Sequence, residues 1–268
     1  MKNRKIIYTL ISLAFATGFY VYDHFFDNKK VINSTIFIKN KSFLPTSTTG
    51  EIVHHKFYTL SYNERYEQAE WVAYTLTKQQ VVYNNFKRPY FEVDKTVPTK
   101  SASYKDYKNS GYNKGHLCPA ADRKFSKDAF NETFLMSNVS PQTHQFNSGI
   151  WNRLEKRVRY WAKKHKKLFI ITGGILSSNL KTIGKDNVAV PAYFYKIILD
   201  YQNPKKLKAI AFLIPHKNSN KSLYKFVTSI DNLEQLTDID FFEQLPDTIE
   251  NKLEKNSSYF NWSFNNFN

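Results

Sequence analysis

The clearest pattern of apolar positions lies between residues 147 and 164. These positions recur at steps of three and four residues, which predicts an amphipathic helix with one buried face. They are Ile150, Trp151, Leu154, Val158 and Trp161. Glu155 and Arg159 stand four residues apart beside this stripe, so we expect them to face the edge of the core as a pair.

Runs of β-branched and aromatic residues predict strands elsewhere in the chain. The runs are 55–60, 71–76, 168–174, 194–200 and 207–214. Residues 240–242 and 249–254 are expected to form short helical pieces. Residues 92–115 lack a clear period and are predicted to be a long loop. Because strands and helices are mixed along the chain, the predicted fold class is α+β.

The first 26 residues have the layout of a targeting segment. Lys2, Arg4 and Lys5 precede an almost wholly apolar or small run over residues 6–22. This order predicts a signal peptide or an N-terminal membrane anchor over 1–26, with the rest of the chain exported. The expected location is periplasmic, extracellular or membrane-anchored; the alternative is a buried helix at the start of the fold. Residues 27–45 are polar and are expected to be a linker.

The net charge indicates the kind of partner. The chain carries 39 Lys and Arg against 23 Asp and Glu, a formal charge of +16. A field of this sign concentrates polyanions such as nucleic acids at the surface, although a lysine-rich composition without any such partner gives the same charge. The single cysteine, Cys118, excludes an intramolecular disulfide and a cysteine-based zinc cluster.

A candidate catalytic histidine lies in the segment 111–122. His116 follows Gly115 and stands three residues before Pro119. It therefore lies in a tight irregular segment where the backbone can approach a ligand and hold the ring in one tautomer. Taken alone, the same histidine also fits an ordinary structural role.

The predicted helix carries further candidates. Asn147 is expected to open the helix, where asparagine is either a cap or an oxygen ligand for a metal. Glu155 and Arg159 fit an ordinary helix ion pair as well as a site. The use of arginine favours a site, because only seven arginines occur and three of them, Arg153, Arg157 and Arg159, lie on this helix. Arginine binds phosphate in a bidentate geometry that lysine does not reproduce.

Three motifs occur in the order seen in a known family. They are Asn113-Lys114-Gly115-His116-Leu117-x-Pro119-Ala120, Phe134-x-x-Ser137-Asn138-x-x-Pro141-Gln142, and Asn147-x-Gly149-x-Trp151-x-x-Leu154-Glu155-x-x-Val158-Arg159. Together they resemble the DNA/RNA non-specific endonuclease family, which belongs to the ββα-metal (His-Me finger) nucleases. The resemblance extends over about residues 46–258, which leaves 259–268 as a C-terminal tail.

The resemblance implies an α+β fold with a largely antiparallel β-sheet core, flanking helices and a ββα-metal finger as the active site. His116 would be the general base. Asn147 would be the direct protein ligand of one Mg²⁺, with Mn²⁺ as a substitute, and Glu155 would bind the metal through water. Of the other matched residues, Arg88, Arg159 and Lys114 would face the substrate phosphate and Asn138 would help to position the site. The implied partners are DNA and RNA substrates, and a second copy of the chain in a homodimer.

Three positions depart from the family's pattern. The usual Asp-Arg-Gly-His is here Asn113-Lys114-Gly115-His116, and Cys118 stands where alanine is common. Lys114 keeps the positive charge but loses the arginine fork, and Asn113 removes a charge that could tune the histidine. The main site residues remain, so we expect an active enzyme. We expect Cys118 to be a small buried apolar residue and not a nucleophile.

Three functions compete at this stage. The first is an exported Mg²⁺-dependent endonuclease that hydrolyses DNA and RNA with a histidine base and a single metal ion, and that contacts mainly the phosphate backbone. The second is a catalytically weak or inactive nucleic-acid-binding or uptake protein on the same scaffold. The third is a basic structural protein held at a membrane by its N-terminal segment, which leaves the ordered motifs unexplained. We favour the first.

Overall fold

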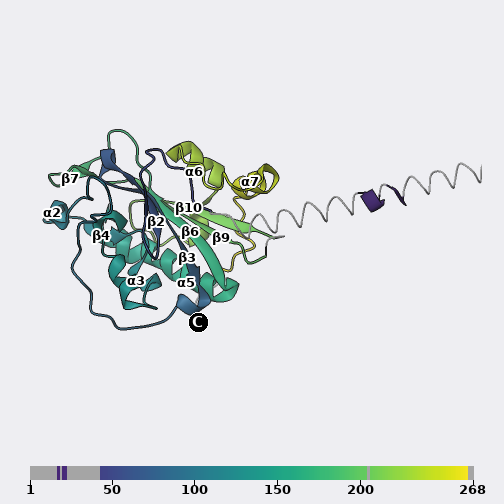
Figure 1. Ribbon diagram of the computed structural model, residues 1–268, viewed down its shortest axis with the longest axis horizontal. Coiled ribbons are helices and arrows are strands. Elements are labelled where there is room, and N and C mark those ends of the chain that lie inside the picture. Colours follow the sequence, from purple (N-terminus) through teal and green to yellow (C-terminus); the bar gives the residue numbers. More distant parts are fainter. Residues whose placement is uncertain (1–16, 19, 23–42, 204–205, 265–268) are drawn as a thin grey trace, which may run out of the picture. The chain divides into compact units, whose positions relative to one another are not determined.

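An antiparallel sheet of seven strands forms the centre of the domain (Figure 1). The computed structural model describes residues 17–18, 20–22, 43–203 and 206–264. Within this part of the chain the strand order is β1-β2-β3-β6-β9-β10-β11, with every neighbouring pair antiparallel. The strands are β1 (Ile52–His54), β2 (Thr59–Asn63), β3 (Gln68–Thr77), β6 (Lys167–Gly174), β9 (Tyr193–Asp200), β10 (Lys208–Pro215) and β11 (Val227–Thr228). The predicted α+β class with an antiparallel core is confirmed.

Both faces of the central strands are buried. Successive side chains of a strand point to opposite faces, and in β9 both Tyr195 and Lys196 are fully buried. Tyr195 packs against Phe241, with 5.5 Å between ring centroids, whereas Lys196 lies over the ring of Trp151. Burial on both faces explains why residues 168–174 form a near-continuous hydrophobic run instead of an alternating one.

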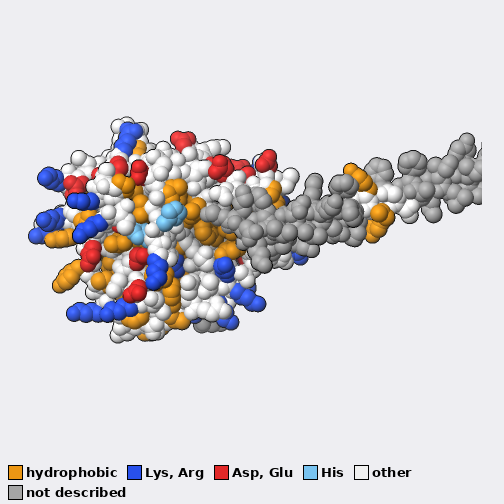
Figure 2. Space-filling view, viewed as in Figure 1, with side chains coloured by type: hydrophobic (Ala, Val, Ile, Leu, Met, Phe, Trp, Pro, Cys, Tyr) orange, Lys and Arg blue, Asp and Glu red, His pale blue; other side chains and the backbone are white. Residues whose placement is uncertain are grey.

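Helices cover the sheet from two sides. The long helix α5 (Asn152–His165) contacts β3 and β6, whereas α6 (Ile230–Thr237) and α7 (Asp247–Glu254) contact β10. In Figure 1, α3 (Lys127–Glu132) and α5 lie below the sheet, and α6 and α7 lie above it. Lys and Arg side chains project over much of this face of the molecule, and acidic side chains gather where α6 and α7 lie (Figure 2).

A separate hairpin leads into the long helix. β4 (Asn113–His116) pairs antiparallel with β5 (Val139–Gln142), and His116 lies opposite Val139. The chain then passes through α4 (His144–Phe146) and a π-helical turn, η5 (Asn147–Trp151), into α5. Two strands followed by a helix form the ββα arrangement that the resemblance implied. Other small elements include α2 (Tyr104–Tyr107), the hairpin of β7 (Thr182–Ile183) with β8 (Val188–Ala189), and several short 3-10 helices.

The helix predicted over 147–164 is correct in its C-terminal part and wrong at its start. Helical structure begins at His144, and Gly149 interrupts it with φ −91° and ψ −111°. A Cβ atom at Gly149 would lie 2.1 Å from Oδ1 of Asn218, so a larger residue there would require the exposed Asn218 side chain to move. Asn147 has helical backbone angles (φ −60°, ψ −50°). It is therefore not the N-cap that its position suggested, because a cap residue is extended.

Other predicted elements also differ. Residues 55–58 form the turn between β1 and β2, closed by the His55 N–H donating to the Tyr58 carbonyl at 2.9 Å. Residues 240–242 are not helical. Helix α6 was not predicted, because Ile230 and Leu233 are its only buried residues and two positions define no period. The loop over 92–115 contains α2 and ends in β4.

The packed domain extends beyond the predicted limits of 46–258. Phe43 is buried against the rings of Phe169 and Tyr201, and Trp262 is buried against Trp161. Parts of the predicted linker and tail therefore belong to the fold.

The predicted leader over 1–26 lies outside the described residues, apart from 17–18 and 20–22. Among the residues that the structure describes, no helix has the length and apolar character needed to cross a bilayer.

Candidate active site

His116 ends strand β4, where its backbone is held on both sides. The β4–β5 pairing fixes the strand up to His116, and the Leu117 N–H donates to the Asn138 carbonyl at 2.9 Å immediately after it. A rigid backbone on both sides of the histidine fixes the direction in which its ring projects. The imidazole thus projects from an ordered element, although the sequence suggested an irregular loop.

The imidazole of His116 lies among aromatic rings. Its ring centroid is 5.5 Å from that of Phe91 and 5.0 Å from that of Phe134. Its Nε2 atom is buried and has no hydrogen-bond partner within the described chain. Burial, together with the nearby charge of Arg88, lowers the pKa of His116 to about 3. The ring is therefore neutral at neutral pH and keeps a nitrogen available for a proton.

Two predicted phosphate-binding cations lie beside the same rings. The guanidinium of exposed Arg88 lies 5.4 Å from the ring centroid of Phe134, and the Lys114 ammonium lies 5.4 Å from that of Phe91. Phe91 and Phe134 thus bring His116, Arg88 and Lys114 together. Neither phenylalanine was predicted as a site residue. Phe134 is the first residue of the second motif, so its position in the sequence could have identified it as a site residue.

Asn138 is a fully buried side chain that binds backbone. Its Oδ1 accepts from the Cys118 N–H at 2.8 Å, and its Nδ2 donates to the carbonyls of Cys118 and Thr133, both at 3.0 Å. The amide thereby fastens the segment after His116 to β5, which fits the predicted positioning role. Cys118 itself is fully buried, and burial raises the pKa of its thiol to about 12. The predicted burial of Cys118 is confirmed, and a thiol with a raised pKa stays protonated, which fits the expectation that it is not a nucleophile.

Arg159 pairs with Asp122, not with Glu155. The Arg159 guanidinium donates to Oδ1 of Asp122 at 2.8 Å, and the Tyr74 hydroxyl donates to Oδ2 at 2.9 Å. The Asp122 side chain is almost completely buried. The alternative of an ordinary ion pair within the helix is therefore wrong. Asp122 was not predicted as a site residue, although it lies only six residues after His116.

Glu155 is half-buried and faces this group of charges. Burial raises the pKa of Glu155 to about 7, and the positive charges of Arg159 and Lys196 oppose the increase. Lys196 lies in β9 with its ammonium 4.8 Å from the ring centroid of Trp151, and its Nζ has no hydrogen-bond partner within the described chain. Lys196 was not predicted as a site residue. It is the single lysine within the apolar run over 194–200, and that placement could have identified it.

Asn147 begins η5, the π-helical turn that is kinked at Gly149 and is here called the kinked turn. Hydrogen bonds to residues outside η5 fix its position. The Asn147 N–H donates to the Thr143 carbonyl at 3.0 Å. The Thr143 N–H donates to Nε2 of His216 at 2.8 Å, and Nδ1 of His216 bonds the Pro191 carbonyl at 2.8 Å. These partners require a neutral His216 with its proton on Nδ1, and burial lowers its pKa accordingly. His216 was also missed.

The hairpin and the kinked turn lie next to each other. The Asn113 amide and Nδ1 of His144 are 3.2 Å apart, which joins the start of β4 to the start of α4. No hydrogen bond links His116 to Asn147. Asn113, where the family has an acidic residue, thus binds the helical turn through an uncharged contact.

The predicted metal ligands offer oxygen donors of the kind that Mg²⁺ prefers. Asn147 supplies an amide oxygen, and Glu155 supplies a carboxylate whose raised pKa a nearby divalent cation would lower. The chemistry of this donor set therefore fits a hard cation that keeps most of its water. Carboxylates close enough to share an ion occur in the described chain at α6–α7, in the groups Asp231, Glu234, Glu254 and Asp240, Glu250, Glu254. Neither group includes a predicted ligand.

Comparison with known proteins gives a consistent result. Residues 38–248 match the model of the DNA/RNA non-specific endonuclease family. The chain is 33% identical over 205 residues to the mitochondrial nuclease EXOG of Mus musculus, covering 70% of this chain and 56% of that protein. It is 31% identical over 234 residues to the mitochondrial endonuclease G of Caenorhabditis elegans, covering 77% of this chain and 76% of that protein. The match thus spans little more than half the length of the first relative.

A solved structure is also similar. The crystal structure of the EndoG/EndoGI complex, whose title concerns the mechanism of EndoG inhibition, aligns with a TM-score of 0.68 and 29% sequence identity. The alignment covers 73% of this chain and 87% of that one. Fold and sequence thus point to the same group of proteins.

The amide of Asn138 gives a stability prediction. Asn138→Ala leaves the buried N–H and carbonyl of Cys118 without partners, so we expect the free energy of unfolding to fall by about 2–4 kcal/mol, measured by urea denaturation. Asn131→Ala, at an exposed position of α3, is the matched control and should change it by less than about 0.5 kcal/mol. An unchanged urea midpoint for Asn138→Ala would show that the amide does not hold this segment.

Proposed function

Because the chain belongs to the DNA/RNA non-specific endonuclease family, we propose that it is a metal-dependent nuclease that hydrolyses phosphodiester bonds in both DNA and RNA. The observation that carries the proposal is the neutral His116, which packs on the same two aromatic rings, Phe91 and Phe134, as the cations Arg88 and Lys114. A free imidazole nitrogen next to positive charge suits proton removal from a water that attacks a phosphate.

His116 acts as the general base in this proposal. The aromatic rings of Phe91 and Phe134 keep the imidazole neutral, so that its unprotonated ring nitrogen accepts the proton of the attacking water. A base must be unprotonated before the reaction, and a lowered pKa meets that requirement throughout the physiological range. The cost of the lowered pKa is weaker basicity, and the negative phosphate of a bound substrate would raise the pKa again.

Arginine and lysine side chains bind the phosphate. Arg88 and Lys114 approach it from the side of His116, and Arg159 approaches from α5. Arg159 is oriented by Asp122 and lines an open surface cavity of about 320 Å³ together with Lys156 and Lys163. Contacts of this kind read the backbone and not the base, which supports activity on both nucleic acids.

We propose Mg²⁺ as the cation, held directly by Asn147 and through water by Glu155. When bound, it would stabilise the negative charge that develops on the phosphate and the leaving oxygen. The charges of Lys196 and Arg159 favour the ionised form of Glu155 that such binding needs. Asn147 is presented by the kinked turn, which the contact between Thr143 and His216 holds in place.

The alternative is a nucleic-acid-binding protein with little or no catalysis. The contact between Asn113 and His144 is the observation that favours it, because an uncharged amide replaces the family's acidic side chain at this position. Both functions predict binding to nucleic acid, and only the first predicts cleavage.

Export is a further proposal, and it is carried by the N-terminal segment. The family match begins at residue 38, after the cationic and apolar leader, and thus does not include it. We expect the full chain to fractionate with the membrane or outside the cytoplasm of a bacterial host, and a chain lacking residues 1–26 to stay in the cytoplasm. Equal distribution of the two chains would contradict export. A homodimer stays a prediction, to be checked by light scattering.

The nuclease proposal predicts cleavage that depends on a metal and on His116. With Mg²⁺, the protein should degrade plasmid DNA and single-stranded RNA on a gel, and EDTA should abolish the degradation. His116→Ala should lower the rate by about 10²–10⁴-fold, because it removes the general base, and should retain binding in a gel-shift assay. Binding without cleavage in either condition would instead establish the alternative function.

The ligand assignment predicts a changed metal requirement. Asn147→Ala should need a higher Mg²⁺ concentration for half-maximal cleavage, because it loses the direct protein ligand. Asn152→Ala, on α5 with its amide donating to the Ser148 carbonyl, is the matched control and should titrate like the wild type. Identical Mg²⁺ titrations for Asn147→Ala and the wild type would mean that Asn147 is not the ligand.

A further inference from the structure

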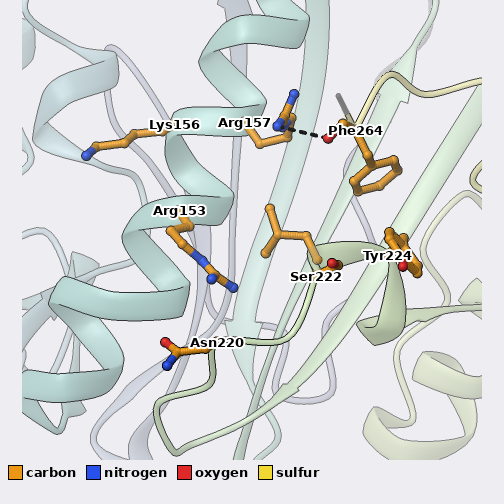
Figure 3. Close-up of a pocket in the computed structure, with 8 residues that line it drawn as sticks. Arg153, Lys156, Arg157, Asn220, Ser222, Tyr224 and Phe264 are labelled. Carbon is orange, nitrogen blue, oxygen red and sulfur yellow. Dashed lines mark hydrogen bonds between the residues drawn. The ribbon is translucent and has the colours of Figure 1, made fainter. Parts of the chain in front are cut away.

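A second basic cavity lies on the far side of α5 from the candidate active site. Its volume is about 370 Å³, and its walls come from α5, the segment 220–224 and the C-terminal segment (Figure 3). At 100° per residue, Arg153 and Arg157 lie about 200° around the helix from Glu155 and Arg159. The proposed nuclease function therefore leaves unused two of the three arginines on this helix.

The lining of this cavity is cationic. The lining residues are Arg153, Lys156, Arg157, Asn220, Ser222, Leu223, Tyr224 and Phe264, and none of them is acidic. Figure 3 shows the Arg153 side chain extending toward the segment that carries Asn220 and Ser222. An anion in this cavity would meet positive charge, an amide and a hydroxyl without any opposing carboxylate in the lining.

Arg153 is oriented but retains unused hydrogen-bond donors. One of its terminal nitrogens donates to the Lys221 carbonyl at 2.7 Å. Its Nε is buried and has no hydrogen-bond partner within the described chain. A guanidinium that lines a cavity and is already fixed by one backbone contact loses little conformational entropy when its terminal nitrogens bind a phosphate.

Arg157 holds in place the wall of the cavity that the C-terminal segment forms. Its guanidinium donates to the carbonyls of Ser263 and Phe264, both at 3.3 Å, and so fastens the C-terminal segment to α5 (Figure 3). Trp262 packs against Trp161 of the same helix, with 4.9 Å between ring centroids. The wall is therefore part of the fold, which makes the cavity a formed site.

A row of stacked aromatic rings extends from the cavity. Tyr224, in its lining, stacks on Tyr259 with 5.1 Å between centroids, and Tyr259 stacks on Phe260 at 4.9 Å. Phe260 is 84% exposed. A large aromatic ring exposed at the end of such a stack offers a free face to an unpaired nucleobase.

We propose that this cavity and the adjoining aromatic row form a second nucleic-acid site, specific for single strands. Arg153 binds a backbone phosphate in the cavity, and Phe260 stacks on a base beside it. In a duplex the bases are already paired and stacked, so they cannot occupy the free face of Phe260. The choice of nucleic acid as the ligand rests on the proposed function, whereas the phosphate and base contacts rest on the cavity itself.

Lys156 connects this site to the candidate active site. It lines both the Arg153 cavity and the cavity that Arg159 lines, and its side chain extends away from Arg153 and Arg157 in Figure 3. A strand seated at Arg153 can therefore follow positive charge around α5 toward Arg159. The second site should retain long single strands during cleavage and leave very short substrates unaffected.

Binding without turnover tests the site. In EDTA, fluorescence anisotropy with a labelled single-stranded DNA of about 20 nucleotides should show about five-fold or greater loss of affinity for Arg153→Gln and for Phe260→Ala. Lys252→Gln and Leu236→Ala, which remove an exposed charge from α7 and an exposed apolar side chain from α6, are the matched controls and should bind like the wild type. Phe260 is exposed, so its replacement keeps the test valid even if Arg153→Gln impairs folding.

Three outcomes would overturn the second site: wild-type affinity in both variants, an equal loss in the controls, or an equal loss for a duplex of the same length. In cleavage assays both variants should raise KM for the long strand without changing kcat, and should cleave a labelled dinucleotide like the wild type. If no substrate is cleaved but binding in EDTA still depends on Arg153 and Phe260, the nuclease proposal fails and the second site stands.

Discussion

The candidate site depends on a set of charges enclosed between α5 and the sheet. Asp122, almost completely buried, accepts from Arg159 and Tyr74, and the half-buried Glu155 lies within reach of the charges of Arg159 and Lys196. Removing a buried ion-pair partner leaves an uncompensated charge, which is far more costly than the pair is stabilising. The cluster therefore constrains how α5 sits on the sheet, and the position of α5 in turn sets where the Glu155 and Arg159 side chains lie.

A second constraint acts on the β4–β5 pair: backbone hydrogen bonds from Asn138 and packing against two aromatic rings fix where His116 projects. Asn138 binds the backbone after His116, so the imidazole projects from a fixed strand end among the rings of Phe91 and Phe134. The same rings that make the histidine neutral also lie beneath Arg88 and Lys114. His116 and the two cations are thus arranged around one apolar pair of rings, and burial there keeps the histidine unprotonated next to positive charge.

The long helix carries different chemistry on its different sides. The side that faces the sheet buries the apolar stripe, one flank holds Glu155 and Arg159, and the other flank carries Arg153 and the buried Arg157. The break at Gly149 separates α5 from the turn that presents Asn147, so the amide and the carboxylate need not follow one helical register. Such irregular helical turns are frequent at functional sites, because they point a side chain where a regular helix would not.

The sequence by itself determined the fold class, the central strands, α5 and the group to which the chain belongs, because hydrophobic period and ordered motifs are local properties of the chain. It also identified His116, Asn138, Asn147, Glu155 and Arg159 as candidates. Only the tertiary structure revealed Asp122, Lys196 and His216 as their partners, since each comes from a different segment and its contacts close only when the sheet and helices pack. The start of the helix at His144 was not predicted either, because the non-helical backbone of Gly149 interrupts the helical period between α4 and α5.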